Sequence, residues 1–333
     1  MQASLHPSTK WDGPTTGPKA VKGKFIAFVA GSLQNGGNLG VLAGFREAAK
    51  LLDWRVQTFD GQNTVSGDSA ALSQAIAVKP DAIVIVGFPY ILTVSEVKAA
   101  VAHHIVVVGW HAQNDPGPSP DHLLFTNVTS PNTAIGKLAG EYAIVATNGR
   151  ARVGILTDLS IPQTLAKADG IKAAIDACQT SSVLTTDSFP FANITTDSPG
   201  LVTAMLQRFG SKLTDIFAIN DLAFDASVPA LRTAGVSATG APHLISAGDG
   251  SASAFQRISA GQFQTATVAE PLYMHGWQVA DELNRAFAGK APSGYVTQPH
   301  LVINADVSEF GGAQSVYNPP NGYQAAYRKI WGV

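Results

Sequence analysis

The sequence has one cysteine, few charged residues and no long apolar run. Cys178 alone can form neither an intrachain disulfide nor a thiolate metal cluster. Charged residues make up 14% of the 333 residues, against roughly 25% in typical globular proteins, so uncharged side chains supply most of the polar surface. The longest apolar runs, such as 105–108, have the length of a strand and are too short to span a membrane.

Neither the charge balance nor the start of the chain indicates a nucleic-acid or membrane partner. The formal net charge is −2, so the chain lacks the basic field that binds a phosphate backbone. The first four residues show no basic segment followed by an apolar one. If the protein is exported, its signal peptide is expected to have been removed. The length predicts two domains.

Short apolar runs alternate with helical spacings along most of the chain. Residues 1–21 are rich in Pro, Gly, Ser and Thr and are interpreted as a flexible, surface-draped arm. Strands are then expected at 24–30, 55–59, 82–86, 105–109, 152–156, 182–186, 215–219, 243–247 and 264–268, with helices between them. Apolar strands separated by helices indicate parallel sheets covered on both faces. The number of units favours two doubly wound α/β lobes.

Uncharged polar and aromatic residues gather just after the expected strands. In an open parallel sheet, ligands bind at the carboxyl ends of the strands. Amides and carboxylates there bind hydroxyl groups, and aromatic rings cover apolar ring faces, so the mixture suits a neutral, hydroxyl-rich molecule. The residues in question include Asn35, Asn38, Phe88, Trp110, His111, Phe191, Asn220, Asp249 and Glu270.

Five segments carry a resemblance to a known family. They are Phe25-Ile26-Ala27-Phe28-Val29 with Leu33-Gln34-Asn35 behind it, 132–142, 216–221, Ile245-Ser246-Ala247-Gly248-Asp249-Gly250, and 261–270. In this order and spacing the chain resembles the type I periplasmic solute-binding proteins of sugar ABC transporters, the ribose-binding-protein-like group, over about 24–303. The resemblance implies two lobes that close over ligand and are joined by a hinge crossed three times, near 126–129, 267–270 and 299–302. Lobe one would comprise 22–127 plus 269–299, and lobe two 128–268 plus 300–333.

The resemblance also implies which residues bind. Asn35, Asn220 and Asp249 match sugar-contacting positions of the family, and Glu270 stands where many relatives have Gln. The chain departs from the ribose pattern in its aromatic residues. Gly37 and Asn38 replace two phenylalanines, Trp110-His111 replaces an Asp-Arg pair, Gly248 replaces a ring, and an arginine usual near 163–167 is missing. Aromatic cover is expected from Phe88, Trp110 and Phe191 instead, with His111 beside them. These departures indicate a solute other than ribose.

The predicted function is therefore that of an exported, periplasmic or extracellular receptor. It would capture a sugar or sugar alcohol and deliver it to an ABC transporter permease, as a monomer. Two alternatives stay open: presentation of a ligand to a chemoreceptor or sensor-kinase ectodomain, and binding of a non-sugar solute. A repressor on the same lobe fold would need an N-terminal helix-turn-helix, which 1–21 cannot supply.

Enzymatic function is not expected. The sequence shows no Gly-x-Ser-x-Gly elbow, and the glycines of 31–37 fit neither a phosphate loop nor a dinucleotide fingerprint. The histidines lack metal-ligand spacing with a glutamate. Neither a metal nor a cofactor is therefore expected, and a nucleic-acid partner is not expected either.

Overall fold

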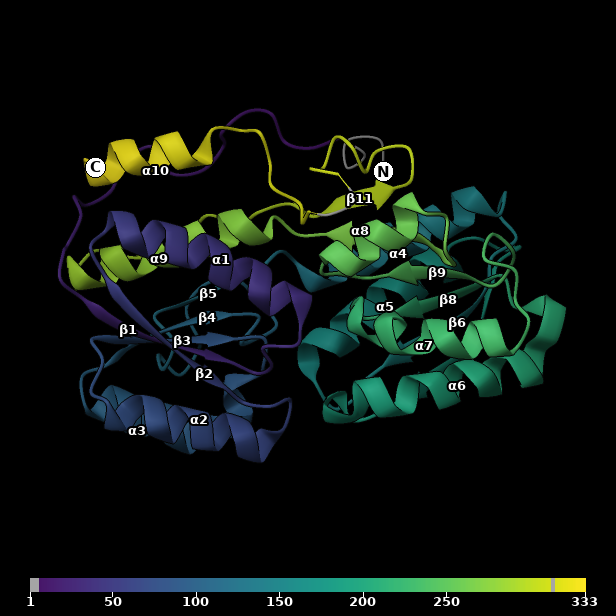
Figure 1. The fold of residues 1–333 in the computed structure, drawn as a ribbon, viewed down its shortest axis with the longest axis horizontal. Coiled ribbons are helices and arrows are strands. Elements are labelled where there is room, and N and C mark those ends of the chain that lie inside the picture. The colour runs from purple at the N-terminus through teal and green to yellow at the C-terminus, as the bar shows by residue number, and fades with distance from the viewer. Residues whose placement is uncertain (1–5, 313–314) are drawn as a thin grey trace. The chain divides into compact units, whose positions relative to one another are not determined.

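The computed structural model describes residues 6–312 and 315–333, which divide into two compact units. Unit 1 comprises 6–7, Pro131–Glu270 and Gln298–Tyr317. Unit 2 comprises Ser8–Ser130, Pro271–Thr297 and Asn318–Val333. Each unit is an α/β layer structure with its own sheet (Figure 1).

Unit 2 is built on a five-stranded parallel sheet. Its strands lie in the order β2-β1-β3-β4-β5. They are β1 (Phe25–Ala30), β2 (Arg55–Asp60), β3 (Ala82–Val86), β4 (Val106–Trp110) and β5 (Thr126–Val128). The helices are α1 (Gly36–Leu51), α2 (Val65–Ala77), α3 (Val94–Ala102), α9 (Leu272–Phe287) and α10 (Tyr323–Trp331), with a 3₁₀ turn, η2 (Tyr90–Thr93), before α3.

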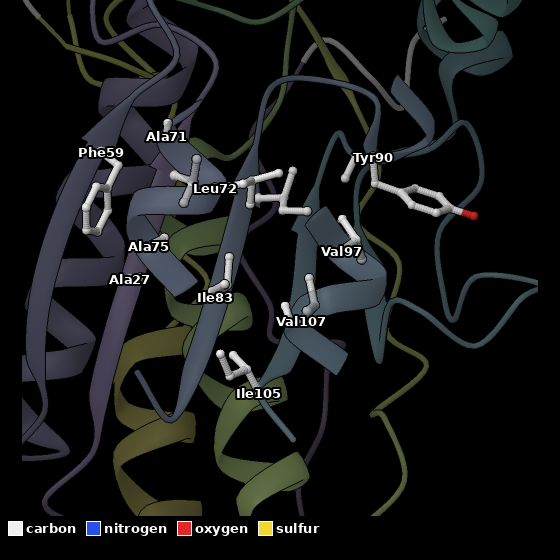
Figure 2. Close-up of a cluster of buried hydrophobic side chains, with 14 of the residues drawn as sticks. Ala27, Phe59, Ala71, Leu72, Ala75, Ile83, Tyr90, Val97, Ile105 and Val107 are labelled. Carbon is white, nitrogen blue, oxygen red and sulfur yellow. The ribbon is translucent and has the colours of Figure 1, made fainter. Parts of the chain in front are cut away.

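Helices cover both faces of this sheet, as its apolar strands predict. Figure 1 shows α2 and α3 on one side and α1 and α9 on the other. On the α2/α3 side, Leu72 and Ala75 pack with Ile83 and Val107 in a cluster drawn in Figure 2. On the other side, the Phe28 and Phe45 rings lie 5.5 Å apart. Because successive residues of a strand face opposite ways, strands buried on both faces are apolar throughout.

Unit 1 contains a six-stranded sheet in the order β11-β10-β9-β8-β6-β7. The strands are β6 (Arg152–Thr157), β7 (Ser182–Ser188), β8 (Asp215–Ala218), β9 (His243–Ser246), β10 (Gln264–Ala269) and β11 (His300–Ile303). All pairs are parallel except β10 with β11. The helices are α4 (Asn132–Ala146), α5 (Pro162–Asp176), α6 (Ile194–Phe209), α7 (Leu222–Thr233) and α8 (Ala252–Ser259), with 3₁₀ turns η3 (Phe191–Asn193) and η4 (Gly210–Lys212).

The core of unit 1 also lies on both sides of its sheet. Ile135 of α4 and Ile171 of α5 pack with Phe217 on one face. Val202 of α6 and Leu231 of α7 pack on the other. The predicted fold class, two α/β lobes with mainly parallel sheets, is confirmed.

The C-terminal helix differs from the expected boundary. The sequence-based boundaries assigned all of 300–333 to lobe two, which corresponds to unit 1. The helix α10 instead belongs to unit 2, because it packs on α9. The Trp331 ring stacks on Trp277 at 5.5 Å, and its indole nitrogen donates a hydrogen bond to Asp281 Oδ1 at 2.8 Å. The chain thus passes between the units at 7/8, 130/131, 270/271, 297/298 and 317/318.

The segment expected to be a flexible arm lies on unit 2 from Ser8 onward. The Trp11 ring lies 5.3 Å from Tyr295 and 5.2 Å from Tyr327. Thr16 accepts a hydrogen bond from Arg285 through its main-chain oxygen. These contacts fit the surface-draped interpretation, whereas residues 1–5 lie outside the described residues. The flexibility of the arm stays a prediction.

Candidate functional site

The predicted site residues fall into two groups, one at the carboxyl edge of each sheet. The unit 2 group lies at or just after the ends of the neighbouring strands β1, β3 and β4, and consists of Asn35, Asn38, Phe88, Trp110 and His111. Phe191, Asn220, Asp249 and Glu270 follow β7, β8, β9 and β10 in unit 1. Each group is described by itself below.

In unit 2, the two asparagines hold the loop after β1. Asn35 is the N-cap of α1, where its Oδ1 accepts hydrogen bonds from the main-chain nitrogens of Gly37 (2.8 Å) and Asn38 (3.3 Å). The Asn38 amide donates to the main-chain oxygen of Ser32 at 2.8 Å. A helix start leaves main-chain donors unpaired, and an asparagine cap satisfies them. The shown role of Asn35 is therefore to fix the start of α1.

Trp110 and His111 form a fixed aromatic wall at the end of β4. The two rings stack at 3.9 Å with 7° between their planes, and Trp110 is 1% exposed. The Trp110 indole donates a hydrogen bond to Nδ1 of the buried His275 at 2.9 Å. Because an indole nitrogen only donates, His275 Nδ1 accepts, and its Nε2 then donates to Thr297 Oγ1 at 2.6 Å. His275, which the sequence reasoning did not select, orients Trp110.

Phe88 serves the core of unit 2. It is buried in the cluster formed with α2 and α3. The preceding Gly87, at φ +78°, lies against Asn38, since a Cβ on Gly87 would be 2.3 Å from Asn38 Oδ1. The loops after β1 and β3 are thus in contact, and only glycine permits that approach.

A buried carboxyl group lies at the end of β2, where sequence reasoning placed none. Asp68, in the first turn of α2, is 5% exposed. Burial, together with the negative charge of Asp60, raises the pKa of Asp68 to about 8. Asp68 is therefore protonated at neutral pH, and Asp60 stays on the surface with hydrogen bonds from the main-chain nitrogens of Leu33 and Gln62.

In unit 1, Asp221 organises the loop that carries Asp249. One oxygen of Asp221 accepts hydrogen bonds from the main-chain nitrogens of Gly250 and Ser251, each at 2.9 Å. The other accepts from Gln264 (2.9 Å) and Thr267 (3.0 Å). A buried carboxylate with several donors is strongly held, so this loop is rigid. Asp221 belongs to the segment 216–221 that carries the family resemblance, but sequence reasoning did not select it as a binding residue.

An ion pair lies at the ends of β8 and β9. Lys167 Nζ is 3.7 Å from Asp249 Oδ1 and donates a hydrogen bond to the main-chain oxygen of Ile219 at 3.2 Å. Lys167 and Asp249 are only 5% and 7% exposed. A Cβ on Gly136 would lie 1.9 Å from the Lys167 main-chain oxygen, so α4 approaches α5 at this residue. Lys167 occupies the stretch where the family's arginine is missing.

Asn220 and Glu270 flank this ion pair in the sheet order. Asn220 is buried, and its Oδ1 has no hydrogen-bond partner among the described residues. A buried amide oxygen normally has a hydrogen-bond partner. A buried amide oxygen without one, at the carboxyl edge of a sheet, is typical of a ligand contact. The main-chain nitrogen of Glu270, also buried, donates to the Asp249 main-chain oxygen at 3.2 Å.

Phe191 lies further along the same edge, at the start of η3. Its main-chain nitrogen donates a hydrogen bond to Asp158 Oδ2 at 2.7 Å. The other oxygen of Asp158 accepts from the Ser160 main-chain nitrogen at 2.9 Å. The half-buried Phe191 ring packs against the α6/α7 core cluster. Asp158 thus joins the loops after β6 and β7.

The fold and these edges define a class: proteins with two α/β units whose sheets end in polar loops suited to a small molecule. The Periplasmic binding protein domain family matches residues 26–291. The chain belongs to this family, whose members are solute-binding proteins.

Solved structures share the fold at low sequence identity. An ABC transporter solute-binding protein from Agrobacterium vitis bound with α-D-tagatopyranose is 18% identical, with a TM-score of 0.77, over 89% of this chain and 99% of its own. A second one from Agrobacterium vitis, with bound allitol, is 21% identical, with a TM-score of 0.72, over 87% and 98%. One from Actinobacillus succinogenes with bound D-allose is 19% identical, with a TM-score of 0.72, over 86% and 100%.

Two further comparisons bear on the chain. No curated protein sequence gave a significant match. Across residues 6–312 and 315–333, the helices all fall short of the length and apolarity needed to cross a membrane.

Proposed function

We propose that this protein is an exported receptor that binds a neutral polyhydroxylated solute, a sugar or sugar alcohol, and delivers it to an ABC transporter permease. The observation that carries this proposal is the grouping of Asp249, Lys167 and Asn220 at the carboxyl edge of unit 1. Membership of the family supports export and a transport role.

The chemistry of these three side chains matches hydroxyl groups. A carboxylate accepts hydrogen bonds from hydroxyl protons, an ammonium donates to hydroxyl oxygens, and an amide does both. Lys167 and Asp249 together carry no net charge, so they favour a neutral solute over an ionic one. Hydrogen bonds to buried groups also discriminate strongly, because a wrong solute leaves them unpaired.

We further propose that the carboxyl edge of unit 2, taken by itself, offers an apolar contact to a solute through His111. Trp110 was predicted for this role, but its ring is covered by His111 and almost fully buried. The half-buried His111 ring is therefore the surface that the Trp110 wall presents. A flat ring against the C–H face of a sugar removes apolar area from water.

The ligands of the relatives support a carbohydrate class. The printed ligands of the three described structures are a ketose, a sugar alcohol and an aldose. The ligand of this chain is proposed to come from the same class, and no catalysis is proposed. We also propose that the protein acts as a monomer, because the site residues proposed here all come from one chain.

A thermal-shift screen tests the proposal. Tagatose, allose, allitol and other sugars and polyols are compared with amino acids and organic acids. A ligand at a hundredfold excess over its Kd stabilises by about 2.7 kcal/mol, which is a shift of several degrees in Tm. We expect a shift with at least one sugar or polyol, and a loss of affinity of at least 100-fold in Asp249→Ala.

The matched control is Asp176→Ala, which removes an exposed carboxylate of the same unit that pairs only loosely with Lys172. It is expected to leave the affinity unchanged. A response confined to amino acids or organic acids would contradict the carbohydrate class. Undiminished sugar binding by Asp249→Ala would contradict the assigned site.

A further inference from the structure

Unit 1 has a concave site away from the residues described above. A cavity of about 420 Å³ lies where β9 and β10 begin and β11 ends. Its walls include His243, Phe263, Ile258 and Ile303. His243 is the first residue of β9, and Asp249 follows the last. A strand rises ~3.3 Å per residue, so the two ends of β9 are about 10 Å apart. The cavity therefore lies at the opposite edge of the sheet.

The floor of the cavity is buried and its rim is exposed. Phe263 and Ile258 are buried in the apolar core clusters of the unit. Ala238 and Ala305, by contrast, lie at the exposed rim. The lining is thus apolar at the bottom and open to solvent at the top, which is the form of a small-molecule pocket.

Hydrogen bonds hold the walls in place. Phe263 donates through its main-chain nitrogen to Ala238 at 2.7 Å, and its oxygen accepts from Leu244 at 2.9 Å. The Gln264 side chain is engaged by Arg257 at 2.8 Å and by Asp221 at 2.9 Å. These walls are preformed, so a ligand would not have to order them.

Within the described part of the chain, a buried polar atom of the lining lacks a hydrogen-bond partner. His243 Nδ1 is buried and has no hydrogen-bond partner among the described residues. Tyr142, by contrast, has its hydroxyl engaged with Thr265. Burial lowers the pKa of His243, so its ring is neutral at pH 7 and offers a single uncharged hydrogen bond.

We propose that this cavity is a second binding site, for a small, largely apolar molecule that carries one hydrogen-bonding group, such as a phenol or an indole. Its volume lies in the range of small-molecule pockets, roughly 300–1,000 Å³. A sugar is disfavoured, because its hydroxyl groups would leave water on binding. The apolar side chains of Ile258, Phe263 and Ile303 would not replace the hydrogen bonds that are lost. The neutral lining gives no ion pair to a charged ligand.

The test titrates the full chain with 2-naphthol by isothermal calorimetry, with the proposed sugar site left intact. We expect one binding event. Ala305→Trp and Thr239→Trp, each made at the exposed rim, fill the cavity and should weaken binding at least tenfold. Ala99→Trp, on an exposed face of α3 in unit 2, is the matched control and should bind as the wild type does. His243→Phe keeps an aromatic ring at this position but has no ring nitrogens, so it should weaken binding two- to tenfold.

Two results would overturn the proposal. One is the absence of binding heat up to the solubility limit of 2-naphthol. The other is equal binding by the wild type and both rim variants, which would place the probe elsewhere. The rim variants should keep the Tm shift with sugar, so a failure of this site and a failure of the proposed function are read separately.

Discussion

The carboxyl edges of the two sheets use the same kinds of residue differently. In unit 2, the Asn35 and Asn38 side chains form hydrogen bonds with neighbouring main-chain groups, and the Trp110 indole donates a hydrogen bond to His275. In unit 1, an ion pair between Lys167 and Asp249 lies at the edge, and the amide oxygen of Asn220 has no hydrogen-bond partner within 6–312 and 315–333. One edge is a wall held by its own contacts, and the other carries polar groups suited to a solute.

The difference shows that a polar residue after a strand does not by itself mark a ligand contact. An asparagine at a helix start has a structural use at hand, because the first helical main-chain nitrogens need acceptors. Among the described residues, the Asn220 amide oxygen accepts no such hydrogen bond, whereas the neighbouring Asp221 accepts one from the main-chain nitrogen of Gly250. The three predictions below test this contrast, from the largest effect to the smallest.

Replacing Asp221 should have the largest effect on stability. Asp221→Ala leaves four donors without their acceptor, those of Gly250, Ser251, Gln264 and Thr267. We expect the free energy of unfolding to fall by about 3 kcal/mol or more, measured by urea denaturation. Asn38→Ala, which removes the Asn38 bond to Ser32 in unit 2, should cost only about 1 kcal/mol. Equal losses would remove the contrast between the edges.

The pH dependence of stability should reveal the neutral carboxyl of unit 2. With a pKa of about 8 in the folded chain and roughly 4 in the unfolded chain, Asp68 binds a proton only in the folded state between these values. Its contribution to stability therefore falls as pH rises from about 4 to about 8. Asp68→Asn should abolish this slope, so its stability relative to the wild type should increase steadily as pH rises from about 4 to about 8.

The measurement for Asp68 is the Tm across that pH range, and Asp176→Asn serves as the exposed control. The control curve should run parallel to that of the wild type. If the Asp68→Asn curve is also parallel, Asp68 is ionised in the folded protein, and the edge of unit 2 carries a charge after all.

The smallest effect on stability is expected at Asn35, where substitutions can distinguish its role as the cap of α1 from its predicted ligand contact. Asn35→Ala removes the cap of α1 and should lower the free energy of unfolding by about 1 kcal/mol. Asn35→Ser keeps a capping oxygen and should restore that stability. If the sugar affinity is also restored, capping is the whole role of Asn35. If Asn35→Ser is stable but binds sugar at least tenfold more weakly, the predicted ligand contact is real.

Much of the fold could be predicted because apolar periodicity is local. The expected strands at 82–86 and 264–268 match β3 and β10 closely. Neither the helix α10 nor the antiparallel strand β11 was predicted from the sequence. Short segments carry weak periodicity, and α10 is fixed by the stacking of Trp331 on Trp277, which lies far away in the sequence.

The sequence by itself determined the alternation of strands and helices, the two α/β units and the loops that bear polar residues. It did so because burial on both faces of a parallel sheet requires a local apolar pattern. Only the tertiary structure decided which polar atoms at those loops are engaged. Asn35 and Asn220 are the same residue type after similar strands. The Asn35 oxygen accepts two main-chain hydrogen bonds, whereas the Asn220 oxygen finds no partner in the described part of the chain. Hydrogen bonds are decided by distances between groups that the chain order does not fix.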